Sequence, residues 1–301
     1  MLSAVGSQAQ VKLTEKNYRI YSTKLQKEVT LADIAKDMAD YDVLFFGEEH
    51  NDSVTHYLEH QMLMKMHEQF GSKVALSMEM FERDVQAVMD EYLADAIREK
   101  HFKKDARVWS NYRDYRPMVE FAKTNKLDVI CANAAARYSN LAGRKGQEAL
   151  KELPDASKDN FAPLPYAVAT GGYLEKLEAM SGHAPSKDTG KAAAPAAMPG
   201  MGDFNLITAQ SLWDATMAYS IASYLKSHKK QKVMQVNGRF HSDEGFAAAT
   251  QLNNYLPKAK KLVISTSSDE QFPNINWKEY AKNGDYIIIT DPSVPRTYSD
   301  K

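Results

Sequence analysis

Two histidines, His50 and His241, each end a G-x-x-H pattern that begins at Gly47 or Gly238. Both patterns follow short apolar runs that predict β-strands, and a glycine at such a point lets the chain turn sharply out of a sheet. A third strand-like run leads into Glu79. Because ligands of open parallel sheets bind beyond the carboxyl ends of the strands, we expect the two histidines and this glutamate to line one cleft.

These side chains, together with Glu48 in the first pattern, suit either of two chemistries. Imidazole nitrogens and carboxylate oxygens form ligand sets for first-row divalent metals, and His50, Glu79 and His241 are the predicted ligands. In a hydrolase, His50 would act as a general base whose tautomer a carboxylate fixes, and His241 would stabilise the transition state. A third interpretation is a structural network of helix caps and ion pairs without turnover.

The elements that must position these residues follow from the hydrophobic pattern. The predicted strands are 42–46, 74–78, 127–132, 232–236, 262–265 and 285–289. Between them, apolar stripes at helical spacing cover 54–70 and 206–224, and Pro117 is expected to begin a helix over 118–125. Strands that are apolar on both faces and alternate with helices predict an α/β fold, a single domain with a mostly parallel central sheet flanked by helices on both faces.

Other residues with potential chemistry have simpler interpretations. His56, His60 and His67 fall on one side of the first long helix, opposite its apolar stripe, so we expect a solvent-exposed face. The segment 109–117 combines aromatic and charged residues, which suits either the wall of a ligand cleft or a packed turn. Arg83 and Arg116 are expected to neutralise an anionic substrate or the crowded carboxylates.

Composition excludes several classes of function. Among 301 residues, 38 Lys and Arg balance 39 Asp and Glu, and the formal net charge of -1 argues against broad binding to nucleic acid. The lone cysteine, Cys131, excludes an internal disulfide and cysteine-based zinc or iron–sulfur sites. No run reaches the roughly 18 apolar residues that a membrane span requires. The composition is that of a soluble globular protein.

Two segments do not look like parts of a folded core. Residues 1–15 begin with small, weakly apolar residues and read either as the remnant of a secretory signal peptide or as a disordered N-terminus, ahead of one domain over 16–301. No cysteine lies near the start, which argues against an N-terminal lipid anchor. Residues 181–203 are rich in Ala, Pro, Gly and Met, and we expect a flexible loop that is either a lid or a tolerated insertion.

Five blocks in a fixed order resemble a known family. They are G-E-E-H at 47–50, M-E-M-F-E-R-D at 78–84, Y-R-P-M-V-E-F-A-K at 115–123, A-Q-S-L-W-D-A-T-M-A at 209–218 and N-G-R-F-H at 237–241. Together they resemble the ChaN-like haem-binding uptake family, part of the Tiki/TraB/erythromycin-esterase superfamily. The resemblance spans residues 42–245. The second G-x-x-H departs from the family's usual G-N-G-H, because Arg239 and Phe240 occupy its variable positions.

The resemblance implies a haem-binding protein of bacterial haem or iron uptake, exported to the periplasm or associated with the outer membrane and its haem transport system. It also implies a homodimer with haem at or near the interface, held by tyrosine with help from histidine, since phenolate is a suitable ligand for ferric iron. The candidate haem-contacting residues are Tyr112, Tyr115, Arg116, Arg239, Tyr166 and Tyr173. Superfamily relatives include hydrolases, some metal-dependent, that use the matching histidines and glutamates, and they supply the alternative function.

Overall fold

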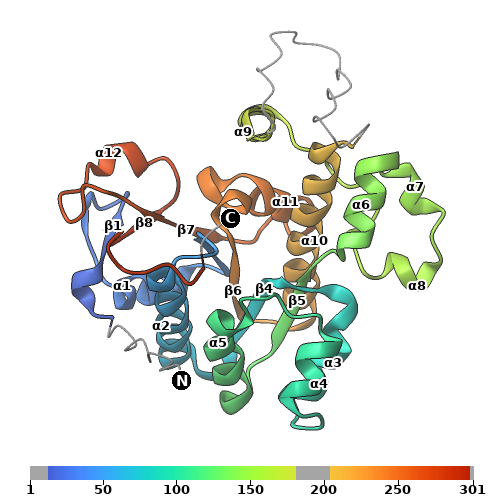
Figure 1. The fold of residues 1–301 in the computed structure, drawn as a ribbon, viewed down its shortest axis with the longest axis horizontal. Helices are drawn as coiled ribbons and strands as arrows, with labels where there is room; N and C mark the ends of the chain where they lie inside the picture. The colour runs from blue at the N-terminus through green and yellow to red at the C-terminus, as the bar shows by residue number, and fades with distance from the viewer. Residues whose placement is uncertain (1–12, 181–203, 299–301) are drawn as a thin grey trace, which may run out of the picture.

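The computed structural model describes residues 13–180 and 204–298. They form an α/β fold around one eight-stranded sheet with the order β2-β1-β8-β7-β3-β6-β4-β5 (Figure 1). The six strands from β8 to β5 are parallel, and β1 and β2 extend one edge in antiparallel pairing. The predicted fold class is confirmed. The 181–203 loop and residues 1–12 of the predicted N-terminal segment lie outside the described residues.

The strands are β1 (Tyr18–Ser22), β2 (Lys27–Glu28), β3 (Val43–Glu48), β4 (Val74–Glu82), β5 (Val129–Asn133), β6 (Lys232–Gly238), β7 (Lys261–Ser268) and β8 (Tyr286–Thr290). The helices are α1 (Leu31–Asp37), α2 (Ser53–Phe70), α3 (Gln86–Leu93), α4 (Glu99–Asp105), α5 (Tyr112–Asn125), α6 (Ala136–Lys145), α7 (Glu148–Lys151), α8 (Asp155–Lys158), α9 (Gly171–Met180), α10 (Leu206–Ser227), α11 (Ala247–Tyr255) and α12 (Trp277–Tyr280). The six predicted strands are present. The edge pair β1 and β2 was not predicted.

Alternating side chains of the central strands supply two cores. On β3, Leu44 and Phe46 pack into a core shared with α1, α2 and α5, whereas Val43 and Phe45 pack against α10 and α11 on the other face. This is the alternation that the pleat of a strand imposes. Every residue of β3 is buried, so the turn that follows it is anchored on both faces. In the described part of the chain, no helix is both long and apolar enough to cross a bilayer.

Helix α5 starts earlier than predicted. It begins at Tyr112, and Pro117 lies inside it, so the prediction that Pro117 begins a helix was wrong. The buried side chains Tyr112, Tyr115, Met118, Val119 and Ala122 recur at helical spacing. Burial of this stripe outweighs the backbone hydrogen bond that proline cannot donate.

Helix α2 packs against α5, and this placement overturns the predicted exposed histidine face. His56 is buried beside Tyr115, while the rings of His60 and His67 lie edge-on against Phe121. The spacing of the histidines placed them correctly on one side of the helix, but that side faces α5 instead of solvent. Asp52 caps the N-terminus of α2 by accepting hydrogen bonds from the backbone of its first turn.

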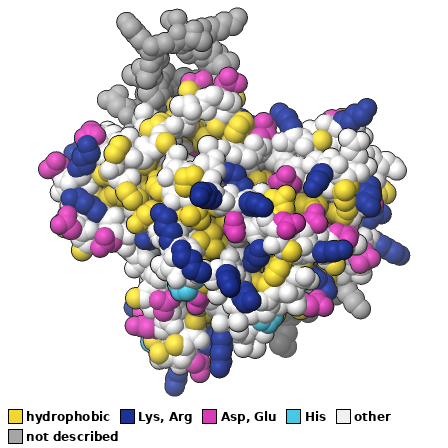
Figure 2. All heavy atoms as spheres, turned by 180° about the vertical axis from the view of Figure 1, so that it is seen from behind, with side chains coloured by type: hydrophobic (Ala, Val, Ile, Leu, Met, Phe, Trp, Pro, Cys, Tyr) yellow, Lys and Arg dark blue, Asp and Glu magenta, His cyan; other side chains and the backbone are white. Residues whose placement is uncertain are grey.

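Surface charge on the face shown in Figure 2 is mixed. Basic and acidic side chains both occur across this face, among apolar and neutral polar ones. This agrees with the near-zero net charge of the sequence.

Candidate functional site

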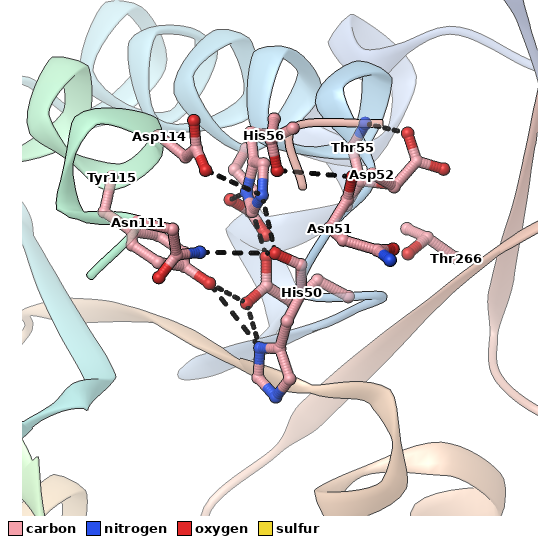
Figure 3. Close-up of polar contacts among 12 residues, drawn as sticks. His50, Asn51, Asp52, Thr55, His56, Asn111, Asp114, Tyr115 and Thr266 are labelled. Carbon is pink, nitrogen blue, oxygen red and sulfur yellow. Dashed lines mark hydrogen bonds and ion pairs between the residues drawn. The ribbon is translucent and has the colours of Figure 1, made fainter. Parts of the chain in front are cut away.

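The first histidine cluster lies where β3 ends and turns toward α2. Glu48, the last residue of β3, is fully buried, and its Oε1 accepts hydrogen bonds from His50 Nδ1 at 2.7 Å and from the Tyr115 hydroxyl at 2.7 Å. The side chain of His50 is 36% exposed, so its ring lies at the boundary between this buried carboxylate and the surface. Figure 3 shows the His50 ring pointing away from α2, with Tyr115 to its left.

A second histidine belongs to the same cluster. His56 Nε2 donates to the backbone oxygen of His50 at 3.1 Å, and Asn111 Nδ2 donates to the same oxygen at 3.3 Å (Figure 3). On the other side of the ring, Nδ1 lies 3.1 Å from Glu48 Oε2 and 3.3 Å from Glu59 Oε2. Glu48 therefore joins the half-exposed imidazole of His50 to a fully buried one.

The other histidine cluster surrounds His241, in a 3-10 turn directly after β6. Its Nδ1 donates to Asp214 Oδ1 at 2.6 Å, and its Nε2 lies 3.4 Å from Glu79 Oε1. Asp214 also accepts the hydroxyl of Tyr173 at 2.7 Å, and Glu79 accepts the backbone N–H of Gly238 at 2.7 Å. All four side chains are buried, so each charge is held by partners instead of water.

The sheet register brings the two clusters together. Strands β3 and β6 are neighbours, with Glu48 opposite Gly238. A Cβ on Gly238 would lie 2.7 Å from His50 Nε2, and a Cβ on Gly47 would lie 2.9 Å from the backbone Cα of Arg239. Both positions therefore require glycine, because a side chain at either one would clash with the residue packed against it. His50 Nε2 lies against the turn that carries His241.

The charge state of each cluster follows from burial and pairing. Burial alone would lower the pKa of His241, but the Glu79 and Asp214 carboxylates outweigh it and raise this pKa well above its ordinary value. Burial likewise opposes the charge of Glu48 and Glu79, yet their histidine partners hold both carboxyl pKa values below the usual range. Burial lowers the pKa of His50, but the bond to Glu48 and the charges of Glu79 and Glu48 together outweigh burial and raise this pKa.

Arginines and an aromatic ring form the rim around His50. Arg296 Nη1 lies 3.0 Å from Glu49 Oε2, and Arg239, which also pairs with Asp243 at 2.9 Å, reaches within 3.7 Å of Glu49 Oε1. The indole of Trp109 lies edge-on to His50, with ring centroids 5.3 Å apart. The rim therefore presents two guanidinium groups and one aromatic surface near the half-exposed imidazole.

Comparison with known proteins identifies the family. A family model described as "Haem-binding uptake, Tiki superfamily, ChaN" matches residues 34–252. The chain belongs to the ChaN family. The match begins in α1, ends in α11 and includes both histidine clusters. It leaves Arg296 on the rim outside the matched region.

A solved ChaN structure has the same fold as this ChaN-family chain. A structure titled "Cofacial heme binding to ChaN of Campylobacter jejuni" superposes with a TM-score of 0.64 at 16% sequence identity, covering 92% of this chain and 98% of that one. The type III effector HopBA1 matches with a TM-score of 0.44 at 13% identity over 87% of this chain and 93% of its own. No curated protein matches the chain.

The predicted polar site residues of this ChaN-family chain come together. Half-exposed His50 pairs with buried Glu48, buried Glu79 and His241 form the other pair, and the two pairs meet through adjacent strands. Strand β4 continues past Glu79, with a register shift between Met78 and Glu82 in its pairing with β5. The prediction that this strand ends at Glu79 was wrong, although the side chain does reach the second cluster.

The tyrosines and arginines predicted to contact haem have different environments. Tyr115 and Tyr173 belong to the clusters, where their hydroxyls donate to Glu48 and Asp214. Three others lie elsewhere: Tyr112 packs among Phe81 and Phe102, Tyr166 donates to the backbone oxygen of Thr208, and Arg116 pairs with Glu99. Burial raises the pKa of all four tyrosine hydroxyls, which favours the neutral phenol over the phenolate. Arg83 bonds to Ser220 and to the backbone of Asp159, away from both clusters.

Three residues of the clusters were not predicted as site residues, and one of them, His56, was assigned to a solvent-exposed helix face. Asp214 is the one acidic residue of α10, within a long apolar stretch, and that isolation was the available signal. Glu59 and His56 lie on α2 among several other polar residues, where nothing in the spacing distinguishes them. Their ligand-bearing atoms and those of Glu48 all lie within 4.8 Å of one another.

Replacing Gly238 with alanine is expected to lower the free energy of unfolding by about 1–3 kcal/mol, because the added methyl group overlaps the His50 ring. Urea denaturation of the single and double variants measures this. In a His50→Ala background the methyl group has room, so the cost of Gly238→Ala should shrink. An equal cost in both backgrounds would show that His50 does not lie against this glycine.

Proposed function

We propose that this ChaN-family chain binds haem in bacterial haem or iron uptake and catalyses no reaction of its own. The observation that carries the proposal is the family match over residues 34–252, which includes both G-x-x-H clusters. The five sequence blocks that resemble the family fall in the same region.

The His50 cluster provides a donor suited to haem iron. An ionised carboxylate only accepts hydrogen bonds, so Glu48 fixes the proton of His50 on Nδ1 and leaves the Nε2 lone pair for a metal. Histidine with its second nitrogen bonded to a carboxylate or carbonyl is a common form of metal ligand. Because His50 is also half-exposed, it is the histidine of the two clusters that we assign to the iron.

The rim of this donor suits the remainder of a haem group. Arg239 and Arg296 both lie near Glu49, and guanidinium groups pair readily with carboxylates such as haem propionates. Trp109 offers an aromatic surface beside His50 for the apolar macrocycle. Tyrosine ligation by Tyr115 or Tyr173 stays a prediction, and it requires the hydroxyl to leave its buried carboxylate partner.

A dimer and an exported location complete the proposal. The Campylobacter jejuni ChaN structure is titled for cofacial haem binding, an arrangement in which two haems face one another. For this chain we infer a homodimer with haem at or near its interface, as the family resemblance implies. We place it in the periplasm or at the outer membrane, where a haem transport system is the expected partner.

Sedimentation velocity with hemin tests both parts of the proposal. We expect the haem absorbance to sediment with the protein, with one haem for each chain, and the sedimentation coefficient to rise to that of a dimer. Haem that sediments with a monomer would contradict the dimer alone. Haem that stays at the meniscus would contradict the proposed function.

A hydrolase is the second candidate, favoured by the pairing of both histidines with buried carboxylates. The Asp214–His241–Glu79 arrangement resembles the way a general base is oriented by an acidic residue. A panel of esters and peptides, with and without divalent metals including Mn²⁺ and Zn²⁺, tests it. Turnover by the wild type that disappears in His50→Ala and His241→Ala would establish a hydrolase and overturn the non-catalytic proposal. Absence of turnover with every substrate would support the non-catalytic proposal.

A further inference from the structure

Two carboxylates and one imidazole meet in the interior, on the far side of Glu48 from His50. Glu48 and Glu59 are each at most 1% exposed, and His56 is 5% exposed. His56 Nδ1 lies 3.1 Å from Glu48 Oε2 and 3.3 Å from Glu59 Oε2. These three side chains, which we call the inner triad, come from the end of β3 and the first two turns of α2.

The hydrogen bonds around His56 determine which of its nitrogens faces the carboxylates as an acceptor. Its Nε2 contacts the backbone oxygen of His50, and a carbonyl oxygen only accepts, so Nε2 carries a proton. In the neutral ring Nδ1 is then a lone pair directed at two carboxylate oxygens. Three electron-rich atoms in a buried space repel one another unless a positive species lies among them.

One oxygen of each carboxylate lacks a hydrogen-bond donor. Glu48 Oε2 and Glu59 Oε1 are among the buried side-chain oxygens of the described residues that have no hydrogen-bond partner, and such atoms call for an explanation. Glu48 uses its other oxygen for His50 and Tyr115. Each member of the inner triad therefore keeps an electron pair for an additional ligand in the space between them.

The spacing fits a metal ion. Ligand atoms that each lie about 2.1 Å from a metal are separated by roughly 3.0–3.4 Å in octahedral or tetrahedral geometry. The two separations from His56 Nδ1, 3.1 and 3.3 Å, fall in this range, and all three ligand atoms lie within 4.8 Å of one another. A divalent cation would neutralise the two carboxylates, and the bond from Nε2 to a backbone carbonyl is the usual outer support of a histidine ligand.

We propose that Glu48, His56 and Glu59 bind one divalent first-row transition-metal ion, at a site separate from the proposed haem site. One imidazole nitrogen and two carboxylate oxygens suit zinc, iron or manganese. Because the site is enclosed, the ion would stabilise the fold instead of activating a substrate. Glu48 would bridge the two sites, with one oxygen on the ion and the other on His50.

Equilibrium dialysis of the haem-free, chelator-treated full chain against Zn²⁺ tests this site. We expect one zinc for each wild-type chain by elemental analysis and a rise in Tm on zinc addition, because ligands that bind the native state stabilise it. His56→Gln and Glu59→Gln should each remove the bound zinc and the rise in Tm. Circular dichroism checks that both variants fold, and Glu59→Gln changes no side-chain volume.

His60→Gln is the matched control, because His60 follows Glu59 on the same helix and contacts Phe121 instead of the inner triad. It should bind zinc like the wild type. Zinc bound equally by wild type, His56→Gln and Glu59→Gln would show adventitious binding elsewhere and overturn the proposal. Failure of the wild-type chain to bind zinc would also overturn the proposal. Protons would then be the positive species between the three side chains of the inner triad. Hemin is absent throughout, so neither result depends on the haem proposal.

Discussion

Replacement of Asp214 by alanine is expected to lower the free energy of unfolding by about 3–5 kcal/mol, the cost of breaking a buried ion pair on one side. The Asp214 carboxylate accepts hydrogen bonds from His241 Nδ1 and from the Tyr173 hydroxyl, and all three groups are buried. Its removal leaves two buried donors without an acceptor. Urea denaturation at neutral pH measures the loss.

The pH dependence of this variant gives a second measurement of the same pair. The folded pKa of His241 is raised above its unfolded value, so its contribution to stability is fully present below about pH 6.5 and is lost as the pH rises through the folded pKa. Asp214→Ala removes one of the two carboxylates that raise the pKa of His241. The decrease in stability between about pH 6 and pH 9 should therefore be smaller in Asp214→Ala than in the wild type.

Asp128→Ala is the matched control for Asp214→Ala. Asp128 also accepts a tyrosine hydroxyl from α10, that of Tyr224 at 2.6 Å, but this bond lies at the exposed end of the helix. We expect its loss to cost about 1 kcal/mol or less. Equal costs for both variants would show that burial of the Asp214 cluster contributes little, which contradicts the charge states described above.

Replacement of His50 by alanine is expected to weaken hemin binding by about 100-fold. Loss of a supporting residue around a metal ligand costs about 10- to 100-fold in affinity, and loss of the ligand itself should reach the upper end. Glu48 keeps its hydrogen bond from Tyr115 and its contact with His56 in this variant, so the fold should persist. Spectrophotometric titration gives the Kd of each variant.

His60→Ala is the control for His50→Ala, because it also removes an imidazole but one that lies against Phe121. Its affinity for hemin should equal that of the wild type. In the wild type, affinity should also fall at acid pH, since the raised pKa of His50 makes protons compete with iron for Nε2. An unchanged Kd in His50→Ala would assign the iron to another residue.

Much of the fold could be predicted because its signals are local. The buried parallel strands are short runs that are apolar on both faces, as in β3 and β8, and that pattern is read directly from the residues. The edge strands were missed because β2 has two exposed residues and β1 is only partly buried. Pro117 was misread because the burial of Tyr115 and the other apolar residues of α5 depends on tertiary packing.

Some residues of the candidate site could be predicted from local sequence signals, and others depend on tertiary packing. His50 and His241 could be paired from sequence because both follow a glycine at the end of a strand, where parallel strands present their ligands. Asp214 and His56 come from helices, and their roles depend on which strand end each helix covers. That choice is made by packing between elements far apart in the chain, so no local pattern in the sequence reports it.

Titration of the wild-type chain with hemin, followed through the Soret band, tests the central claim most directly. A chain that binds haem through His50 should shift the Soret band in a saturable way, with one haem bound for each chain. A spectrum identical to that of free hemin at every ratio would contradict haem binding by this ChaN-family protein.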